Sequence, residues 1–179
     1  MAGENSALKA EEAAKAAGID MSQFMNKAHP CLGVNRVLDA EAGQIELLMP
    51  DGVTPRRKFA LVGFASSTKD MAPFNDPEWA ICGMNQLYRH TFHKGVDGKP
   101  VLRHPDLHYE IHREWNTAVV PDTDHAGWLR DCGVPVLMAN RVEGIPTSVR
   151  YPVERLAQRF DLDYFTSTVA FMVALALLE

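Results

Sequence analysis

The sequence predicts an α/β protein with a mainly parallel β-sheet and flanking helices. Apolar segments of the length of strands, buried on both faces of a sheet, occur at residues 58–65, 79–84 and 134–139. Segments with helical composition or capping residues occur at residues 123–132, 152–160 and 166–179. Strands that alternate with helices are typical of parallel sheets, because each crossover connection can carry a helix.

Residues 1–57 are expected to precede the main domain as an N-terminal helix and an irregular extension. Helix-forming Ala, Glu and Lys dominate residues 4–17, and Gly18 follows as a C-cap. This helix is predicted to be weakly packed because it holds few large apolar side chains; the alternative is a helix that binds a partner. Within the extension, the sequence favours a strand at 44–49 and a turn at 50–52.

The main domain is expected to span residues 58–179. Residues 66–77 and 93–106 are rich in turn-forming residues and are predicted as loops. Residues 107–115 alternate between apolar and polar side chains, which predicts a strand. In doubly wound sheets, a helix such as 166–179 is normally followed by a turn and another strand. The sheet is therefore expected to lack its last strand, unless this helix packs in another way.

Composition and charge argue against several classes of protein. The chain has 179 residues, a formal net charge of -5 and scattered basic residues, so a dedicated nucleic-acid binder is not expected. Three cysteines without a CxxC pair predict neither a disulfide framework nor a zinc knuckle, and they favour a reducing cytosol. The apolar run at 169–178 is shorter than the roughly 20 residues of a membrane span, so no membrane partner is expected.

Two hydroxyl-bearing turns are candidate binding sites for an anion. Ser66, Ser67 and Thr68 follow the first strand of the main domain, at the edge where parallel sheets bind ligands. Thr166 and Ser167 open the last helix, whose N-terminus has free backbone N–H groups. We expect both turns to converge at one edge of the sheet. The alternatives are an ordinary Ser/Thr turn and a simple helix cap.

A second group of candidates could hydrogen bond a ligand or transfer a proton. Asn85 follows the next strand and offers an amide suited to a nucleobase or ribose, or else it caps the following helix. His108, Glu110 and His112 share one strand face and are weak candidates for a metal site; a solvated histidine-rich face is the alternative. His112 and His125 are the candidate catalytic residues, because histidine ordinarily titrates near neutral pH. For His125 the alternative is an exposed helix N-terminus.

Five segments of the chain together resemble a known group of proteins. They are LVGFASST (61–68), WAICGMNQLY (79–88), YEIH (109–112), SVRYP (148–152) and YFTSTVA (164–170). In this order they resemble poorly characterised Rossmann-like proteins encoded by bacteriophages, which are distantly similar to the hydroxymethylpterin diphosphokinase-like and sialyltransferase-like families. The resemblance covers roughly residues 58–179. It implies a Rossmann-like domain that binds its ligand at the carboxyl edge of the sheet, through Ser66, Ser67, Asn85, Thr166 and Ser167.

The function expected is the binding of a nucleotide or nucleotide-sugar, with glycosyl or phosphoryl transfer as the activity of an active enzyme. The hydroxyl-bearing turns would orient the ligand, and His112 or His125 would transfer a proton. A phage-encoded protein of this kind would lie in the cytoplasm of the host cell. Two alternatives stay open. One is a non-catalytic virion or assembly protein on a degenerate Rossmann-like scaffold, with further copies or phage structural proteins as partners. The other is a metal-dependent hydrolase that uses His108, Glu110 and His112.

Overall fold

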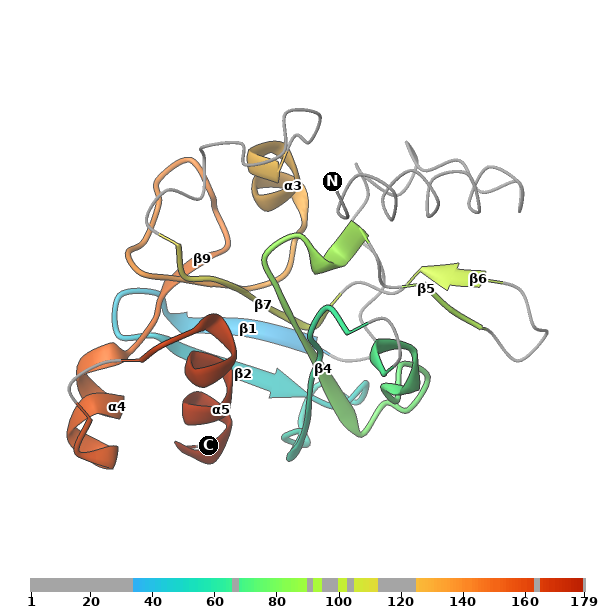
Figure 1. The fold of residues 1–179 in the computed structure, drawn as a ribbon, viewed down its shortest axis with the longest axis horizontal. Coiled ribbons are helices and arrows are strands. Elements are labelled where there is room, and N and C mark those ends of the chain that lie inside the picture. The colour runs from blue at the N-terminus through green and yellow to red at the C-terminus, as the bar shows by residue number, and fades with distance from the viewer. Residues whose placement is uncertain are drawn as a thin grey trace.

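The centre of the molecule is a five-stranded sheet in which all strands are parallel (Figure 1). The computed structural model describes residues 34–65, 68–89, 92–94, 100–102, 105–112, 125–162 and 165–178. The spatial order of the strands is also their chain order: β3 (Lys58–Leu61), β4 (Trp79–Met84), β7 (Leu107–Glu110), β8 (Val136–Met138) and β9 (Ser148–Arg150). The predicted α/β fold with a parallel, Rossmann-like sheet is confirmed. β9 is a strand that the sequence analysis missed.

Helices cover both faces of this sheet. α4 (Val153–Phe160) and α5 (Thr168–Leu178) lie together on one face, and α3 (His125–Asp131) lies on the other (Figure 1). Successive side chains of β8 point to opposite faces, so the sheet separates two hydrophobic cores. Leu137 packs with α4 and α5 in one core, and Met138 packs with α3 in the other. All three helices fall within the predicted helical segments.

The direction of winding explains why α4 and α5 share a face. Phe74 after β3 and Leu87 after β4 pack against Ile81, on the face of the sheet opposite α4 and α5. A sheet that is wound in one direction keeps its right-handed crossovers on one face. After β9 the chain changes face, and α5 passes back over the sheet to contact β3 and β7.

A β-hairpin completes the face that α4 and α5 cover. It consists of β1 (Val34–Asp39) and β2 (Gln44–Leu48), which pair in antiparallel fashion. The predicted turn after β2 is present, since the Gly52 N–H donates to the Met49 carbonyl at 2.9 Å. The strand predicted at 44–49 is β2, whereas its partner β1 was not predicted. Leu47 of β2 is buried in the core, so the hairpin packs on the sheet. The helix predicted at residues 4–17 lies outside the described residues.

Short elements lie within or beside the segments that were predicted as loops. The 3-10 turns η1 (Lys69–Met71) and η2 (Leu87–Arg89) follow β3 and β4, respectively. β5 (Phe92–Lys94) and β6 (Pro100–Leu102) form a hairpin that projects away from α4 and α5 (Figure 1). Of the helices in the described part of the chain, none combines the length and the apolar character needed to cross a bilayer.

A fully buried ion pair joins the hairpin to the sheet. The Arg56 guanidinium lies 2.9 Å from the Asp106 carboxylate, and neither side chain is exposed to solvent. Arg56 also donates to the carbonyl of Leu48 at 2.9 Å and to that of Trp79 at 3.1 Å. Asp106 accepts a hydrogen bond from the Ile81 N–H at 2.8 Å. Since both charges are paired and hydrogen bonded, the pair fixes the hairpin, β4 and the start of β7 relative to one another.

Replacing Arg56 by Met should destabilise the fold by about 3–5 kcal/mol, because it leaves a buried carboxylate without its cation. Urea unfolding followed by circular dichroism measures the loss. The control is Lys58→Met, which breaks the exposed pair of Lys58 with Glu78 and should leave the unfolding midpoint nearly unchanged. Similar midpoints for the two variants would contradict a central role for Arg56.

Candidate functional site

The carboxyl end of β7 carries the polar side chains of the candidate site. His108 and Glu110 are buried on the α3 face, while Leu107 and Tyr109 pack into the core on the opposite face. The structure thus bears out the alternation predicted for this strand. It ends β7 at Glu110, and residues 113–115 of the predicted strand lie outside the described residues.

The Glu110 carboxylate joins the two histidines that the sequence singled out as catalytic candidates. Its Oε1 lies 2.8 Å from Nδ1 of His112, and its Oε2 lies 2.8 Å from Nε2 of His125. The other ring nitrogen of His125, Nδ1, lies 3.2 Å from the Tyr88 hydroxyl. Only His112 is open to solvent, with 61% of its side chain exposed against 10% for His125 and 2% for Glu110. The network therefore runs from a buried tyrosine to an exposed imidazole.

The charge of Glu110 determines which ring nitrogens of the two histidines carry protons. Burial on its own would raise the pKa of Glu110, but the hydrogen bonds from His125 and His112 outweigh it and lower the pKa overall. An ionised carboxylate only accepts hydrogen bonds, so Nδ1 of His112 and Nε2 of His125 both carry protons. In a neutral His112 the lone pair is then on Nε2. Nδ1 of a neutral His125 accepts the hydrogen bond from Tyr88.

Aromatic packing fixes the position of His125. Its ring stacks on Tyr88 with 5.7 Å between centroids, and Tyr88 in turn stacks on Trp128 of α3 at 3.8 Å. Trp128 meets His108 edge-to-face at 4.8 Å. Both ring nitrogens of His125 are also hydrogen bonded, one to Glu110 and the other to Tyr88. His125 is therefore held in place beside Glu110 and can orient its carboxylate.

A cleft of about 710 Å³ opens beside His112. Its wall follows the carboxyl ends of β7, β8 and β9 and the starts of α4 and α5. The lining residues are Ile111, His112, Met138, Ala139, Asn140, Val142, Arg150, Tyr151, Val153, Glu154 and Phe171. Open α/β sheets bind ligands at this edge, and volumes of about 300–1,000 Å³ are typical of ligand pockets.

The start of α5 reaches this cleft through Phe171, but Thr166 and Ser167 are not among the residues that line it. Phe171 in the first turn of α5 lines the cleft, and its carbonyl accepts a hydrogen bond from the Tyr151 hydroxyl at 2.8 Å. Burial raises the pKa of Tyr151, which keeps this hydroxyl protonated. Ser167 acts as a helix cap, because its Oγ accepts the Ala170 N–H at 3.3 Å. Thr166 is exposed one residue earlier.

The other predicted ligand-binding residues lie near the ends of β3 and β4. Ser66 and Ser67 lie outside the described residues, and Thr68 is exposed directly before η1. The predicted convergence of the two turns is therefore not tested. Asn85 follows β4 in a left-handed conformation with φ 49°. Its Oδ1 is enclosed and has no hydrogen-bond partner in the described part of the chain, while its backbone N–H donates to the Tyr109 carbonyl.

The structure does not arrange the weak metal candidates as a ligand set. No group of three or more His, Cys, Asp or Glu in the described part of the chain is placed to hold a metal ion. The Glu110 carboxylate contacts His112 and His125 through their ring nitrogens, and His108 packs against Trp128. Glu110 thus organises histidines by hydrogen bonding.

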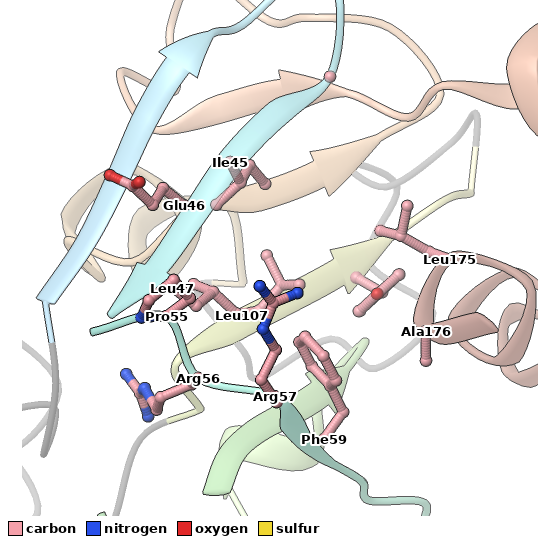
Figure 2. A pocket seen from close by; sticks show the side chains of 12 residues that line it. Ile45, Glu46, Leu47, Pro55, Arg56, Arg57, Phe59, Leu107, Leu175 and Ala176 are labelled. Carbon is pink, nitrogen blue, oxygen red and sulfur yellow. The ribbon is translucent and has the colours of Figure 1, made fainter. Parts of the chain in front are cut away.

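A second cavity lies away from the carboxyl edge. It has about 160 Å³ and is lined by the hairpin, the amino ends of β3 and β7, and the end of α5. Figure 2 shows the Arg57 side chain beside Phe59 and Leu107, while the Arg56 guanidinium points the other way. This cavity is too small for a nucleotide, so the larger cleft is the better candidate for the functional site.

Sequence reasoning missed several residues of the site. Tyr88 was given no role beyond following the strand at 79–84, although it lies in η2 and contacts His125. Arg150 and Glu154 were missed because the three-residue strand β9 has no strong apolar pattern. A polar residue at the end of a parallel strand, or within two residues of it, is the signal that could have found Asn140 and Arg150.

Comparisons with protein-family models, curated proteins and solved structures give no match to this chain. The resemblance to phage-encoded Rossmann-like proteins therefore stays a prediction. The function of the cleft has to be inferred from its geometry and chemistry.

Replacing Glu110 by Gln should destabilise the fold by about 1–3 kcal/mol at pH 7, because an amide cannot accept from both ring N–H groups. The folded pKa of Glu110 lies below the ordinary value of 4.5. Its carboxylate therefore stabilises the fold fully above pH 4.5, and this contribution is lost as the pH falls through the folded pKa.

The difference in unfolding free energy between the wild type and Glu110→Gln should accordingly shrink below pH 4.5 in urea titrations. Glu143→Gln, which removes an exposed carboxylate, is the control and should change little at either pH. A difference that stays constant with pH would show that the hydrogen bonds of Glu110 do not depend on its charge.

Proposed function

We propose that the protein binds a nucleotide or nucleotide-sugar in the cleft of about 710 Å³ and acts as a group transferase. One observation carries the proposal: His112 lines this cleft while its Nδ1 is held by the buried Glu110 carboxylate. An exposed imidazole oriented by a buried carboxylate is a common arrangement for proton transfer. Its place at the carboxyl edge of a parallel sheet favours a ligand that spans this edge.

The chemistry follows from the proton on Nδ1 of His112. The lone pair on Nε2 removes the proton of an acceptor hydroxyl as that oxygen attacks the glycosyl or phosphoryl centre. The bond to the leaving group breaks, and its electron pair leaves with the nucleotide portion. The negative charge of Glu110 stabilises the imidazolium that forms on His112. His125 is then a positioning residue, since it hydrogen bonds to Glu110 from the buried side.

Polar groups around the cleft support a phosphorylated ligand. The first turn of α5 contributes Phe171 to the cleft wall, and Thr166 precedes this helix, whose N-terminus favours an anion. Asn140 adds an amide that suits a ribose or a base. The apolar side chains of Ile111 and Val142 supply surface on which a base or sugar ring can pack.

Differential scanning fluorimetry with nucleoside monophosphates, UDP and UDP-glucose tests the binding. A ligand present at 100 times its Kd stabilises the folded state by about 2.7 kcal/mol, which corresponds to a rise in Tm of roughly 5–10 °C for a chain of this size. No rise with any nucleotide would contradict the proposal and would favour the non-catalytic assembly protein.

His112→Asn tests the role of the imidazole. The Asn amide can still donate to Glu110, but it lacks the nitrogen that corresponds to Nε2. Hydrolysis of the nucleotide-sugar that binds best should fall about 10²–10⁴-fold while its Kd changes little. Glu78→Gln, far from the cleft at the start of β4, is the control and should keep both values. Unchanged turnover in His112→Asn would rule out this residue as the base.

A further inference from the structure

Arg150 and Glu154 are the two formally charged side chains among the residues that line the cleft, apart from the titratable His112. Arg150 ends β9, and Glu154 lies in the first turn of α4. The Arg150 guanidinium hydrogen bonds to Oε1 of Glu154, four residues further along the chain. The carboxylate thus holds the guanidinium at the wall of the same cleft that contains His112.

This ion pair is easily exchanged. Its side chains are 36% and 64% exposed, and exposed pairs contribute little to stability because water screens them. A phosphate group carries more charge than a carboxylate and offers three acceptor oxygens, two of which can bind a guanidinium side by side. A phosphorylated ligand is therefore the better partner for Arg150, and Glu154 is the group that it displaces.

The sheet also sets how far this cation lies from the proton-transfer residue. Glu110, Met138 and Arg150 are in register across three adjacent strands. Two strand spacings place the ends of β7 and β9 about 10 Å apart. A free phosphate cannot bridge that separation. A nucleotide-sugar or another extended phosphorylated ligand can reach from Arg150 to His112.

We propose that Arg150 is the residue of the cleft that binds the phosphate of the ligand. Until the ligand binds, the Glu154 carboxylate pairs with the Arg150 guanidinium in its place. The ligand is then a phosphorylated compound whose reacting group lies roughly two strand spacings from the phosphate. This inference rests on the proposed function for the cleft. It adds the residue that recognises the phosphate and a competing group within the protein.

Isothermal titration calorimetry with UDP-glucose and with sodium pyrophosphate tests the proposal on the full chain. Arg150→Gln should weaken binding of both probes at least about tenfold, because it removes a charge-assisted bidentate contact. Glu154→Gln should tighten binding of both about threefold to fivefold, because Arg150 no longer has to leave a carboxylate. Glu78→Gln is the matched control: it makes the same charge change beside Lys58 at the amino edge and should leave both affinities unchanged.

The outcomes separate this inference from the proposed function. If UDP-glucose binds and neither Arg150→Gln nor Glu154→Gln alters its affinity, the cleft binds nucleotides but Arg150 is not the receptor. If Glu78→Gln tightens binding as much as Glu154→Gln does, the change in net charge explains the effect. The proposed competition between Glu154 and the phosphate for Arg150 is then overturned. If only pyrophosphate binds, and Arg150→Gln abolishes that binding, Arg150 is a phosphate receptor while the nucleotide function fails. Binding of neither probe overturns both.

Discussion

The buried pair of Arg56 and Asp106 is the interaction on which the arrangement of the molecule depends. A charge inside a protein is tolerated only when it is paired and hydrogen bonded. Here the pair satisfies this condition by drawing on the hairpin, on β4 and on the start of β7. Each of these segments is thereby fixed at the amino edge of the sheet. Because the strands are short and paired in register, fixing this edge also sets where the strands end at the carboxyl edge.

β7 has a buried carboxylate at each end, and the two have different partners. Asp106 precedes the strand and is neutralised by a guanidinium that has no access to solvent. Glu110 ends the strand and is bound by two histidines, one of which lines an open cleft. The first arrangement can only stabilise the fold. The second connects a buried negative charge to an imidazole that lines an open cleft, and for this reason we propose the carboxyl edge as the functional one.

The architecture was predictable because it rests on local patterns. The apolar segments at β3 and β4 are strands, and the alternation of β7 was correct in placing His108 and Glu110 on one face. The strand predicted at 44–49 is β2, but its hairpin partner β1 and the strand β9 were missed. Three residues carry too little periodicity to indicate a strand, and a two-stranded hairpin is stable only through the surface on which it packs.

The sequence by itself determined the parallel α/β sheet, because the strands and helices follow from the periodicity of neighbouring residues. It also singled out His112 and His125, though as separate candidates. Only the tertiary structure decided that both bind the same carboxylate, that Arg56 is buried and that Arg150 faces the cleft. These facts depend on contacts between residues such as Arg56 and Asp106 that lie far apart in the chain, and no local pattern records which distant partner a charged side chain will meet.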